Sequence, residues 1–434
     1  MPVEVVDLDL TAETGAIPQP TFTDVGLVET RTDSPPDAEF GELNRYSNSS
    51  DVADDYGEES DVADASAAVE QMGASYWFVL SLEAQEATET LTDGETTELE
   101  WSPILGEPMP EGDGDEAIGF TTDLANADNL AEDDDIVLNA AAGEAFNGSD
   151  ADVELTYYYV MWSDLDALGD DVNRVGVANR KFGIPNIGTL DALVTHASGD
   201  NMGVVAAGID GRTAADDDAA MTEYHETFSF VPSGDLLAVA HKSADTVEGY
   251  ILGQLAVNDP WFDPFYDGSG YPFNTNFYNR TLVGDPATPG TFEGGDADDK
   301  QGNVNVIISK AGTQVLSNSV TTAGSASDYQ FFDIGRTQDF LAAEVTRALT
   351  SLRLRQDQIP FNSSGRDQII NTMRSTVSQY VGGGGPLSDF EITVPPRDEL
   401  TDDNVANRVW NNIELEVTLA GNVHQFSVEL RVTV

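Results

Sequence analysis

The sequence predicts a mixed α/β fold of the α+β class, spread over more than one domain. Strand and helix patterns alternate along much of the chain. The 434 residues, 40% of them hydrophobic and 9% aromatic, are enough to bury one large or two ordinary cores. Both ends of the chain carry strand patterns, and these predict sheets that recruit the termini.

The terminal strand patterns are the clearest in the sequence. Residues 3–10 (VEVVDLDL) are rich in β-branched and aliphatic side chains and are followed by the turn-prone pair Thr14-Gly15. Residues 426–434 alternate apolar with polar side chains throughout. A terminal strand frays unless something pairs with it. These two strands therefore either complete the protein's own sheet or add to exposed edges on other subunits.

The N-terminal part predicts a strand, a helix and a second strand. Residues 22–29 have the pattern of a short strand. In residues 61–73 the apolar side chains recur at helical spacing, with Asp61 placed to cap the helix and Gly73 to end it. Residues 76–82 (YWFVLSL) predict a buried strand directly after this helix.

Acidic residues dominate the middle of the chain. No lysine or arginine occurs between Arg45 and Arg174, and residues 83–152 combine carboxylates with glycine and proline. Burying so many unpaired carboxylates would be prohibitive, so this segment predicts a solvent-facing insertion. Beyond it we expect strands at residues 155–162 and 202–207, a helix near residues 190–196, and an ordered aromatic loop at residues 258–273.

The C-terminal part has the most legible pattern. It predicts two striped helices, a flexible joint at the four glycines of residues 382–385, and a short helix between strands. In order, the expected elements are a strand at residues 303–310, helices at 341–352 and 369–380, a strand at 390–394, a helix at 401–410 and a strand at 413–419.

The net charge of −59, from 78 acidic against 19 basic residues, indicates adaptation to molar salt. There the Debye length falls to about 3 Å and dense carboxylates are screened. We expect a halophilic archaeal or viral source and no direct nucleic-acid partner, because no basic stripe is present to meet phosphates. No stretch approaches a membrane span, so no direct membrane insertion is expected, and the chain reads as a soluble cytoplasmic product.

Arginines cluster in one region of this acidic chain. Residues 336–374 hold six of them, on and around the two striped helices. Such guanidinium groups either face a carboxylate-rich partner surface or neutralise the subunit's own carboxylates. The candidate contact residues are Arg347, Arg353, Arg355, Arg366 and Arg374.

Catalytic and cofactor chemistry is not indicated. There is no cysteine, and His225-Glu226 lacks the second histidine that a zinc helix requires. The acidic run of residues 111–116 lacks the spacing of a calcium loop, and the glycines of residues 382–385 lack the lysine of a phosphate loop. We therefore expect no enzyme activity, no metal site and no cofactor. The alternative is a monomeric halophilic ligand-binding or glycan-active protein whose aromatic loop, residues 261–271, forms a cleft.

The C-terminal third resembles the contractile tail sheath proteins of phages, archaeal myoviruses and related contractile injection systems. No single matching piece is diagnostic, but the ordered combination is specific. The pieces are Asn303-Val304, Thr321-Thr322-Ala323-Gly324, Phe332-Asp333-Ile334-Gly335-Arg336 with Gln338-Asp339, Gln358-Ile359-Pro360-Phe361 with Gly365, Asn407-Arg408, and Leu419-Ala420-Gly421-Asn422-Val423-His424. Asn422 stands where the family usually has alanine, and residues 83–300 depart from anything that aligns.

The resemblance implies a division of the chain and a use for its ends. It implies an N-terminal arm strand at residues 1–20, an outer α/β domain at 21–300 with the acidic insertion at about 83–152, an inner sheath domain at 301–420, and a C-terminal arm strand at 421–434. Sheath arms complete sheets on adjacent subunits. The matching residues here are Val3, Val5, Val6, Leu8 and Leu10 in one arm and Phe426, Val428, Leu430, Val432 and Val434 in the other.

The resemblance also implies a structural role without chemistry. A haloarchaeal sheath subunit would assemble in the host cytoplasm into the virion tail, with itself as main partner in hexameric rings stacked helically. Its further partners would be the tail tube protein, the baseplate and the tail terminator. Contraction of the polymer would drive the tube through the host envelope for genome ejection. The arginine cluster would contact the tube or the next ring.

Overall fold

In the computed structural model the chain divides into two units, each with its own core. Unit 1 comprises residues 1–21, 260–263 and 333–434, and unit 2 comprises residues 22–259 and 264–332. The structure describes residues 6–7, 24–101, 105–111, 118–120, 136–139, 143–148, 151–160, 162–169, 172–178, 190, 193–195, 203–209, 233–241, 246–264, 305–310, 313–316, 319–323, 331–356, 359–407, 409–410 and 412–420. The mixture of helices and strands agrees with the predicted α+β class.

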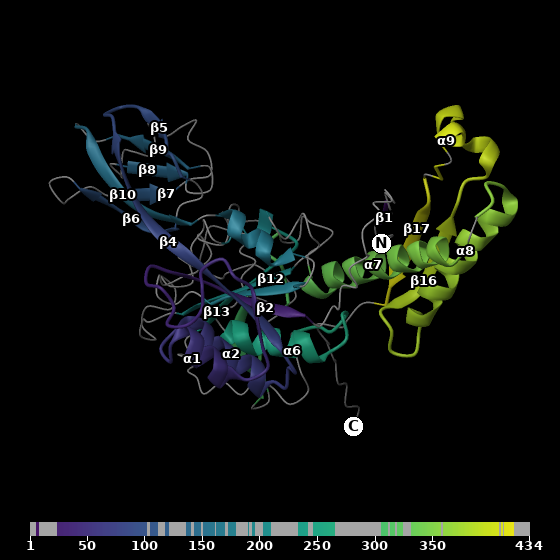
Figure 1. Cartoon of the computed structure of the whole chain (residues 1–434), viewed down its shortest axis with the longest axis horizontal. Helices are drawn as coiled ribbons and strands as arrows, with labels where there is room; N and C mark the ends of the chain where they lie inside the picture. Colours follow the sequence, from purple (N-terminus) through teal and green to yellow (C-terminus); the bar gives the residue numbers. More distant parts are fainter. Residues whose placement is uncertain are drawn as a thin grey trace, which may run out of the picture. The chain divides into compact units, whose positions relative to one another are not determined.

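Parallel strands form the centre of unit 2 (Figure 1). They follow the spatial order β4-β2-β11-β12-β13-β14. Their bounds are Trp77–Leu91 for β4, Val25–Arg31 for β2, Arg174–Val177 for β11, Gly203–Ile209 for β12, Leu236–His241 for β13 and Asn305–Lys310 for β14. Counted along the chain this is the order 2-1-3-4-5-6, that of a doubly wound α/β sheet. The predicted strand at residues 303–310 is thus β14 and continues the sheet of unit 2.

Antiparallel strands extend the sheet on both sides. β15 (Thr313–Leu316) pairs with β14, whereas β3 (Asn44–Tyr46) and β10 (Val153–Val160) both pair with β4. β6 (Leu105–Glu111) then pairs with β10. The two halves of β4 differ, because its first half lies in the parallel sheet and is largely buried, while the second half pairs with β10 and alternates in burial.

The described part of the acidic insertion is folded and has its own core. A second sheet of order β5-β9-β8-β7 packs there, with strands Thr96–Glu98, Glu144–Asn147, Ile136–Asn139 and Ile118–Phe120. Leu91, Ile136, Leu138 and Tyr157 are fully buried in this core. Trp101 stacks on Tyr159 with ring centroids 4.4 Å apart. The alternation of apolar with acidic residues lets the strands bury one face and hydrate the other.

Three helices carry most of the helical packing of unit 2: α1 (Ser49–Tyr56), α2 (Asp61–Gln71) and α6 (Val247–Val257). The expected helix at residues 61–73 is confirmed, but its cap is Ser60, whose Oγ accepts from the Ala63 N–H at 3.2 Å. Gly73 has φ of 95°, the left-handed conformation that ends a helix. A 3₁₀ turn, η2 (Trp162–Ala167), follows β10.

Two glycines allow α6 to lie directly against α2. A Cβ atom on Gly249 would lie 2.4 Å from the Ala65 carbonyl oxygen, and one on Gly253 would lie 2.6 Å from Cβ of Met72. Thr246 Oγ1 donates to the Asp64 carbonyl at 3.2 Å, and Tyr250 Oη lies 3.0 Å from Gln71 Oε1. Residues 247–255 of α6 are all buried. The helix is therefore a core element, held where only glycine gives enough room.

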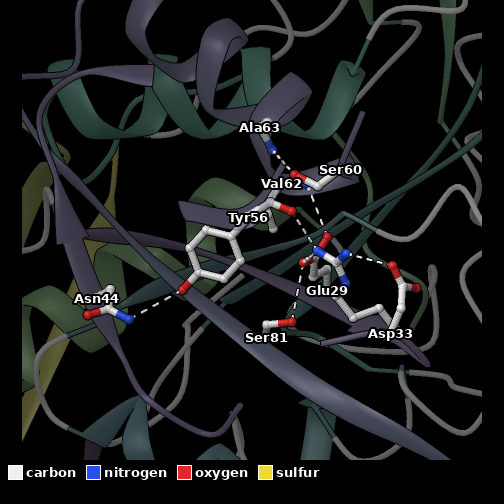
Figure 2. A network of polar contacts seen from close by, with 9 residues as sticks. Glu29, Asp33, Asn44, Tyr56, Ser60, Val62, Ala63 and Ser81 are labelled. Carbon is white, nitrogen blue, oxygen red and sulfur yellow. Dashed lines mark hydrogen bonds and ion pairs between the residues drawn. The ribbon is translucent and has the colours of Figure 1, made fainter. Parts of the chain in front are cut away.

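A buried carboxylate joins β2 to β4 and α2 (Figure 2). Glu29 is 3% exposed and accepts from Ser81 Oγ at 3.2 Å and from the Val62 N–H at 3.4 Å. Arg31 lies 3.4 Å from it and donates to the Tyr56 carbonyl at 2.8 Å and to Asp33 at 2.9 Å. Burial raises the pKa of the Glu29 carboxyl above its ordinary value of 4.5, with Arg31 acting in the opposite direction.

Unit 1 is a layer of helices on a small sheet. Its helices are α7 (Phe332–Arg355), most of which belongs to this unit, α8 (Ser363–Val377) and α9 (Asp402–Asn407), with 3₁₀ turns η6 (Ser378–Tyr380) and η7 (Arg397–Glu399). The sheet has the order β1-β17-β16, with strands Val6–Asp7, Glu414–Leu419 and Leu387–Thr393. The core joins the two layers through Leu341, Val345, Met373, Leu415 and Val417.

The close approach of α6 to α2 leads to the first testable prediction. The variant Gly249→Val places its Cβ against the Ala65 carbonyl, and we expect it to lower the free energy of unfolding by about 1–3 kcal/mol or more, the usual cost of overpacking. Val257→Ala, on an exposed position of the same helix, is the control and should change it by less than about 0.5 kcal/mol. Denaturant titration in molar salt measures both. Equal stabilities of the two variants would contradict the packing.

The second prediction concerns the buried Glu29. Because its pKa is raised in the folded state, the folded protein binds this proton more tightly than the unfolded chain does. Its contribution to the free energy of unfolding therefore falls as pH rises from 4.5 through the folded-state pKa. Glu29→Gln removes this titration, so the stability of the variant relative to wild type should increase over that window.

The measurement is denaturant unfolding at constant high salt over a pH series from about 4 to 8. Glu58→Gln, an exposed position in the same unit, is the matched control and should run parallel to wild type. A difference between Glu29→Gln and wild type that stays flat across the series would show that Glu29 does not titrate there.

Candidate assembly interface

The small sheet of unit 1 holds the one described strand of the predicted arms. β17 lies at its centre and pairs antiparallel with β16, with Leu415 opposite Ile392 and Val417 opposite Phe390. β1 pairs antiparallel with the other edge of β17, and Val6 lies opposite Leu415. One face of the sheet is closed by α7 and α8, so the opposite face and the outer edge of β16 are the parts open to a partner.

The entry into β16 is shaped by consecutive glycines. Gly382, Gly383 and Gly384 have φ of 68°, 63° and 96°, which side-chain-bearing residues rarely adopt. The Gly382 N–H donates to the Leu387 carbonyl at 3.0 Å, and this turns the chain from η6 into β16. Within the part of the chain that the structure describes, no strand pairs with the outer edge of β16. The expected flexible joint is thus a defined turn that presents an edge strand.

The structure describes only part of the predicted arms. Val6 lies in β1, which pairs within the same chain, in keeping with the alternative that a terminal strand completes the protein's own sheet. The other predicted exchange residues lie outside the described residues: Val3, Val5, Leu8, Leu10, Phe426, Val428, Leu430, Val432 and Val434. Exchange between subunits stays a prediction.

The predicted contact arginines fall into two groups. Arg347 pairs with Glu344 three residues earlier on α7, and Arg366 Nε donates to the Val394 carbonyl at 2.7 Å. Arg353, Arg355 and Arg374 are exposed, and within the described residues none of the three lies within ion-pair distance of a carboxylate. Two of the five are thus committed to their own unit, and three are available to a partner.

In the described part of the predicted aromatic loop, the Trp261 side chain packs against other aromatic rings. Trp261 lies edge-on to Phe340 of α7 and to Tyr380 of η6, with ring centroids 5.7 and 5.9 Å apart. Phe340 and Tyr380 themselves lie 5.0 Å apart. Trp261 is therefore a half-buried side chain packed against two aromatic rings of its own unit. The rest of the proposed cleft, residues 265–271, lies outside the described residues.

Sites for chemistry were sought in the same residues. Within the described residues no group of three or more histidine, aspartate or glutamate side chains is placed to hold a metal ion. Glu29 combines burial with a raised pKa, as catalytic acids do, but its oxygens are engaged by Ser81, Arg31 and the start of α2. Searched over the same described residues, the helices include none that is long and apolar enough to cross a membrane.

One feature of the interface was missed in the sequence. Glu391 of β16 lies directly opposite Glu416 of β17, and Thr393 lies opposite Glu414. The alternation of residues 413–419 predicted which residues of β17 face outward. The pairing with β16 could not be predicted, because strand register depends on contacts across the sheet rather than on either strand alone.

Comparison with known proteins identifies the fold. No protein-family model matches the chain, and no curated protein matches its sequence. The chain is similar in structure to a chain of the anti-feeding prophage baseplate, with a TM-score of 0.57 and 11% identity over 98% of both chains. It is similar to the PVC sheath complex in the contracted state, with a TM-score of 0.57 and 9% identity over 99% of this chain and 96% of that one.

A third comparison is with the helical sheath of the anti-feeding prophage in its contracted state. The TM-score is 0.52 at 14% identity, over 100% of this chain and 95% of that chain. The protein therefore shares, along nearly its whole length, the fold of proteins from contractile injection systems. These neighbours include sheath proteins, which are structural, and none of the three is named as an enzyme.

Proposed function

We propose that this protein is a structural subunit of a contractile sheath, which polymerises around an inner tube and shortens to drive the tube through a target envelope. The observation that carries the proposal is the fold shared with a helical sheath subunit over the whole of this chain. The motifs of the C-terminal third support it independently, since they were recognised in the sequence alone.

The small sheet of unit 1 supplies the proposed joint between subunits. The C-terminal arm, residues 426–434, is a donor strand of suitable alternation, and the outer edge of β16 is an acceptor without a described neighbour. The N-terminal arm is the second donor, and its position on β17 marks the site that it would fill on a neighbour. At about 1 kcal/mol for each backbone hydrogen bond, an arm forming six bonds contributes several kcal/mol. Such joints keep neighbours attached while the remaining contacts change.

The proposed assembly consists of rings of six subunits stacked helically, in the tail of a virion or a related injection particle, assembled in the host cytoplasm. The tube protein, baseplate and tail terminator are its other partners. The charge of −59 favours assembly in molar salt, as in a haloarchaeal host, because screening removes the repulsion between adjacent acidic subunits. Contacts between unlike surfaces form a closed ring when the rotation from copy to copy closes, and a helical polymer when it does not.

The proposed contraction requires no catalytic residue. The extended polymer is a metastable state held by the baseplate, and release allows subunits to move into a wider and shorter lattice that buries more surface. The energy is stored during assembly, because the barrier between the two packings keeps the less stable one in place. The arms act as tethers during this change.

The third prediction tests the proposed function directly. Purified protein in molar salt should form tubes or sheath-like polymers visible by electron microscopy, since its surfaces repeat from copy to copy. Discrete monomers at all salt and protein concentrations would contradict the proposal. They would favour the monomeric ligand-binding or glycan-active protein instead.

The fourth prediction tests the N-terminal arm. Deleting residues 1–10 removes β1 but leaves both hydrophobic cores intact, so we expect a folded subunit that no longer polymerises. Circular dichroism and thermal unfolding check the fold, and sedimentation checks the polymer. The matched control replaces residues 11–20, which lie between β1 and β2, by a glycine-serine linker of equal length and should retain assembly. Polymers formed by the deletion variant would refute the role of this arm.

A further inference from the structure

The sheet of unit 1 has an acidic outward face. On the outward face of the sheet, Asp389, Glu391, Glu414 and Glu416 are all exposed. Strand register places Glu391 directly opposite Glu416. Like charges in this position destabilise an antiparallel pair, so the arrangement does not serve the stability of the sheet itself. We name these four residues the acidic sheet face.

The last turns of α7 and α8 carry exposed arginines, whereas Asp367 of α8 and both aspartates of α9 are exposed acidic residues of the same layer. Arg353 and Arg355 lie in the last turn of α7, and Arg374 lies in the last turn of α8. All three are exposed and have no carboxylate partner within the described residues. Leu354, between the first two, is 76% exposed and supplies apolar area at the same place. Tyr380, just beyond α8, contacts Glu344 and Phe340 towards the middle of α7, so the two helices run antiparallel and Arg374 lies away from the end of α7. We name Arg353, Leu354 and Arg355 the basic tip.

Local effects do not account for the basic tip. A cation in the last turn of a helix gains about 0.3–1 kcal/mol from the helix dipole. This gain can explain why arginines occur at the helix end, but it does not explain why Leu354 is exposed there. The chain has 78 acidic residues against 19 basic ones, so many carboxylates are present that could pair with an arginine. Exposed guanidinium groups without such a partner can bind carboxylates from outside the unit.

We propose that the acidic sheet face of one subunit docks on the basic tip of a second copy of this chain. This inference rests on the proposed self-assembly and names the surfaces that carry it. The partner is a second copy because both complementary surfaces lie on the same chain. The contact joins two different surfaces, so each bound copy leaves one of each free, and further copies can add until a ring closes or as a helical polymer.

In molar salt, this contact depends on short-range ion pairs rather than on long-range attraction. With a Debye length of about 3 Å, long-range attraction between the faces is screened away. Arginine–carboxylate pairs at hydrogen-bond distance survive, because the guanidinium group binds both oxygens in a fixed geometry. The contact therefore selects the register and orientation of neighbouring copies, while strand pairing and apolar burial supply most of the binding free energy.

The test exchanges the charges of the two surfaces in the full-length chain. Variant A carries Arg353→Glu and Arg355→Glu, which makes both surfaces acidic. Variant B carries Glu391→Lys, Glu414→Lys and Glu416→Lys, which makes both surfaces basic. A combined variant carries all five substitutions. The matched control places three lysines at exposed sites of unit 2, through Asp51→Lys, Asp54→Lys and Glu58→Lys.

We expect variants A and B to fold but to polymerise poorly, with the critical concentration for assembly raised by about tenfold or more. An equimolar mixture of A and B should form polymers containing both, and the combined variant should polymerise alone. The control should assemble like wild type. Sedimentation and electron microscopy in the salt that supports wild-type assembly give the readout, with circular dichroism as the check on folding.

Failure of this inference differs from failure of the proposed function. If wild type polymerises and variant A polymerises equally well, or if mixing A with B restores nothing, the docking of these two surfaces is wrong while the sheath function stands. If variant A forms empty polymers normally but no longer encloses tube protein, the basic tip serves the tube and the inference is also overturned. If wild type itself never polymerises, the proposed function fails.

Discussion

Backbone pairing along β17 is the interaction on which the rest of unit 1 depends. This strand, residues 414–419, hydrogen-bonds to β16 on one edge and to β1 on the other. Its inward residues Leu415 and Val417 close the core beneath α7 and α8, and its outward residues Glu414 and Glu416 form half of the acidic sheet face. A single period-two pattern thus places the core residues, the strand that pairs with β1 and the exposed carboxylates at once. A slip by one residue would exchange the buried and exposed sets and lose all three.

Within the described residues the carboxylates lie outside the apolar cores with few exceptions, namely the buried side chains of Glu29, Glu248 and Asp333. In unit 2 the core of the parallel sheet is built from fully buried valines and leucines such as Val28, Leu80 and Val175. Glu29, an exception, is held by hydrogen bonds to Ser81 and to the start of α2, and its raised pKa reflects the cost of keeping it there. Screening by salt acts on exposed carboxylates, whereas this buried one depends on its own partners.

The sequence predicted those helices and strands whose pattern has one apolar, buried face and one polar, solvent-exposed face. The helix at residues 61–73, the striped helices that became α7 and α8, and the strand at residues 413–419 were all recognised in this way. α6 was missed because it is buried on every side and has no polar face to mark a period. The pairing of β1 with β17 was missed because register and partner depend on contacts more than 400 residues apart in sequence.

The pairing of β1 within its own chain is energetically compatible with pairing on a neighbour. The same backbone hydrogen bonds form in either arrangement, so their strength does not favour one over the other. The two arrangements differ in the segment between β1 and β2. It connects β1 either to the β17 strand of its own subunit or to that of an adjacent subunit. An isolated subunit has only its own β17 within reach, whereas a packed lattice offers adjacent β17 strands at high effective concentration. The arm is therefore expected to pair within the chain in the monomer and between chains in the polymer. Under the proposed function, such an exchange would give the lattice cohesion at little cost in hydrogen bonds.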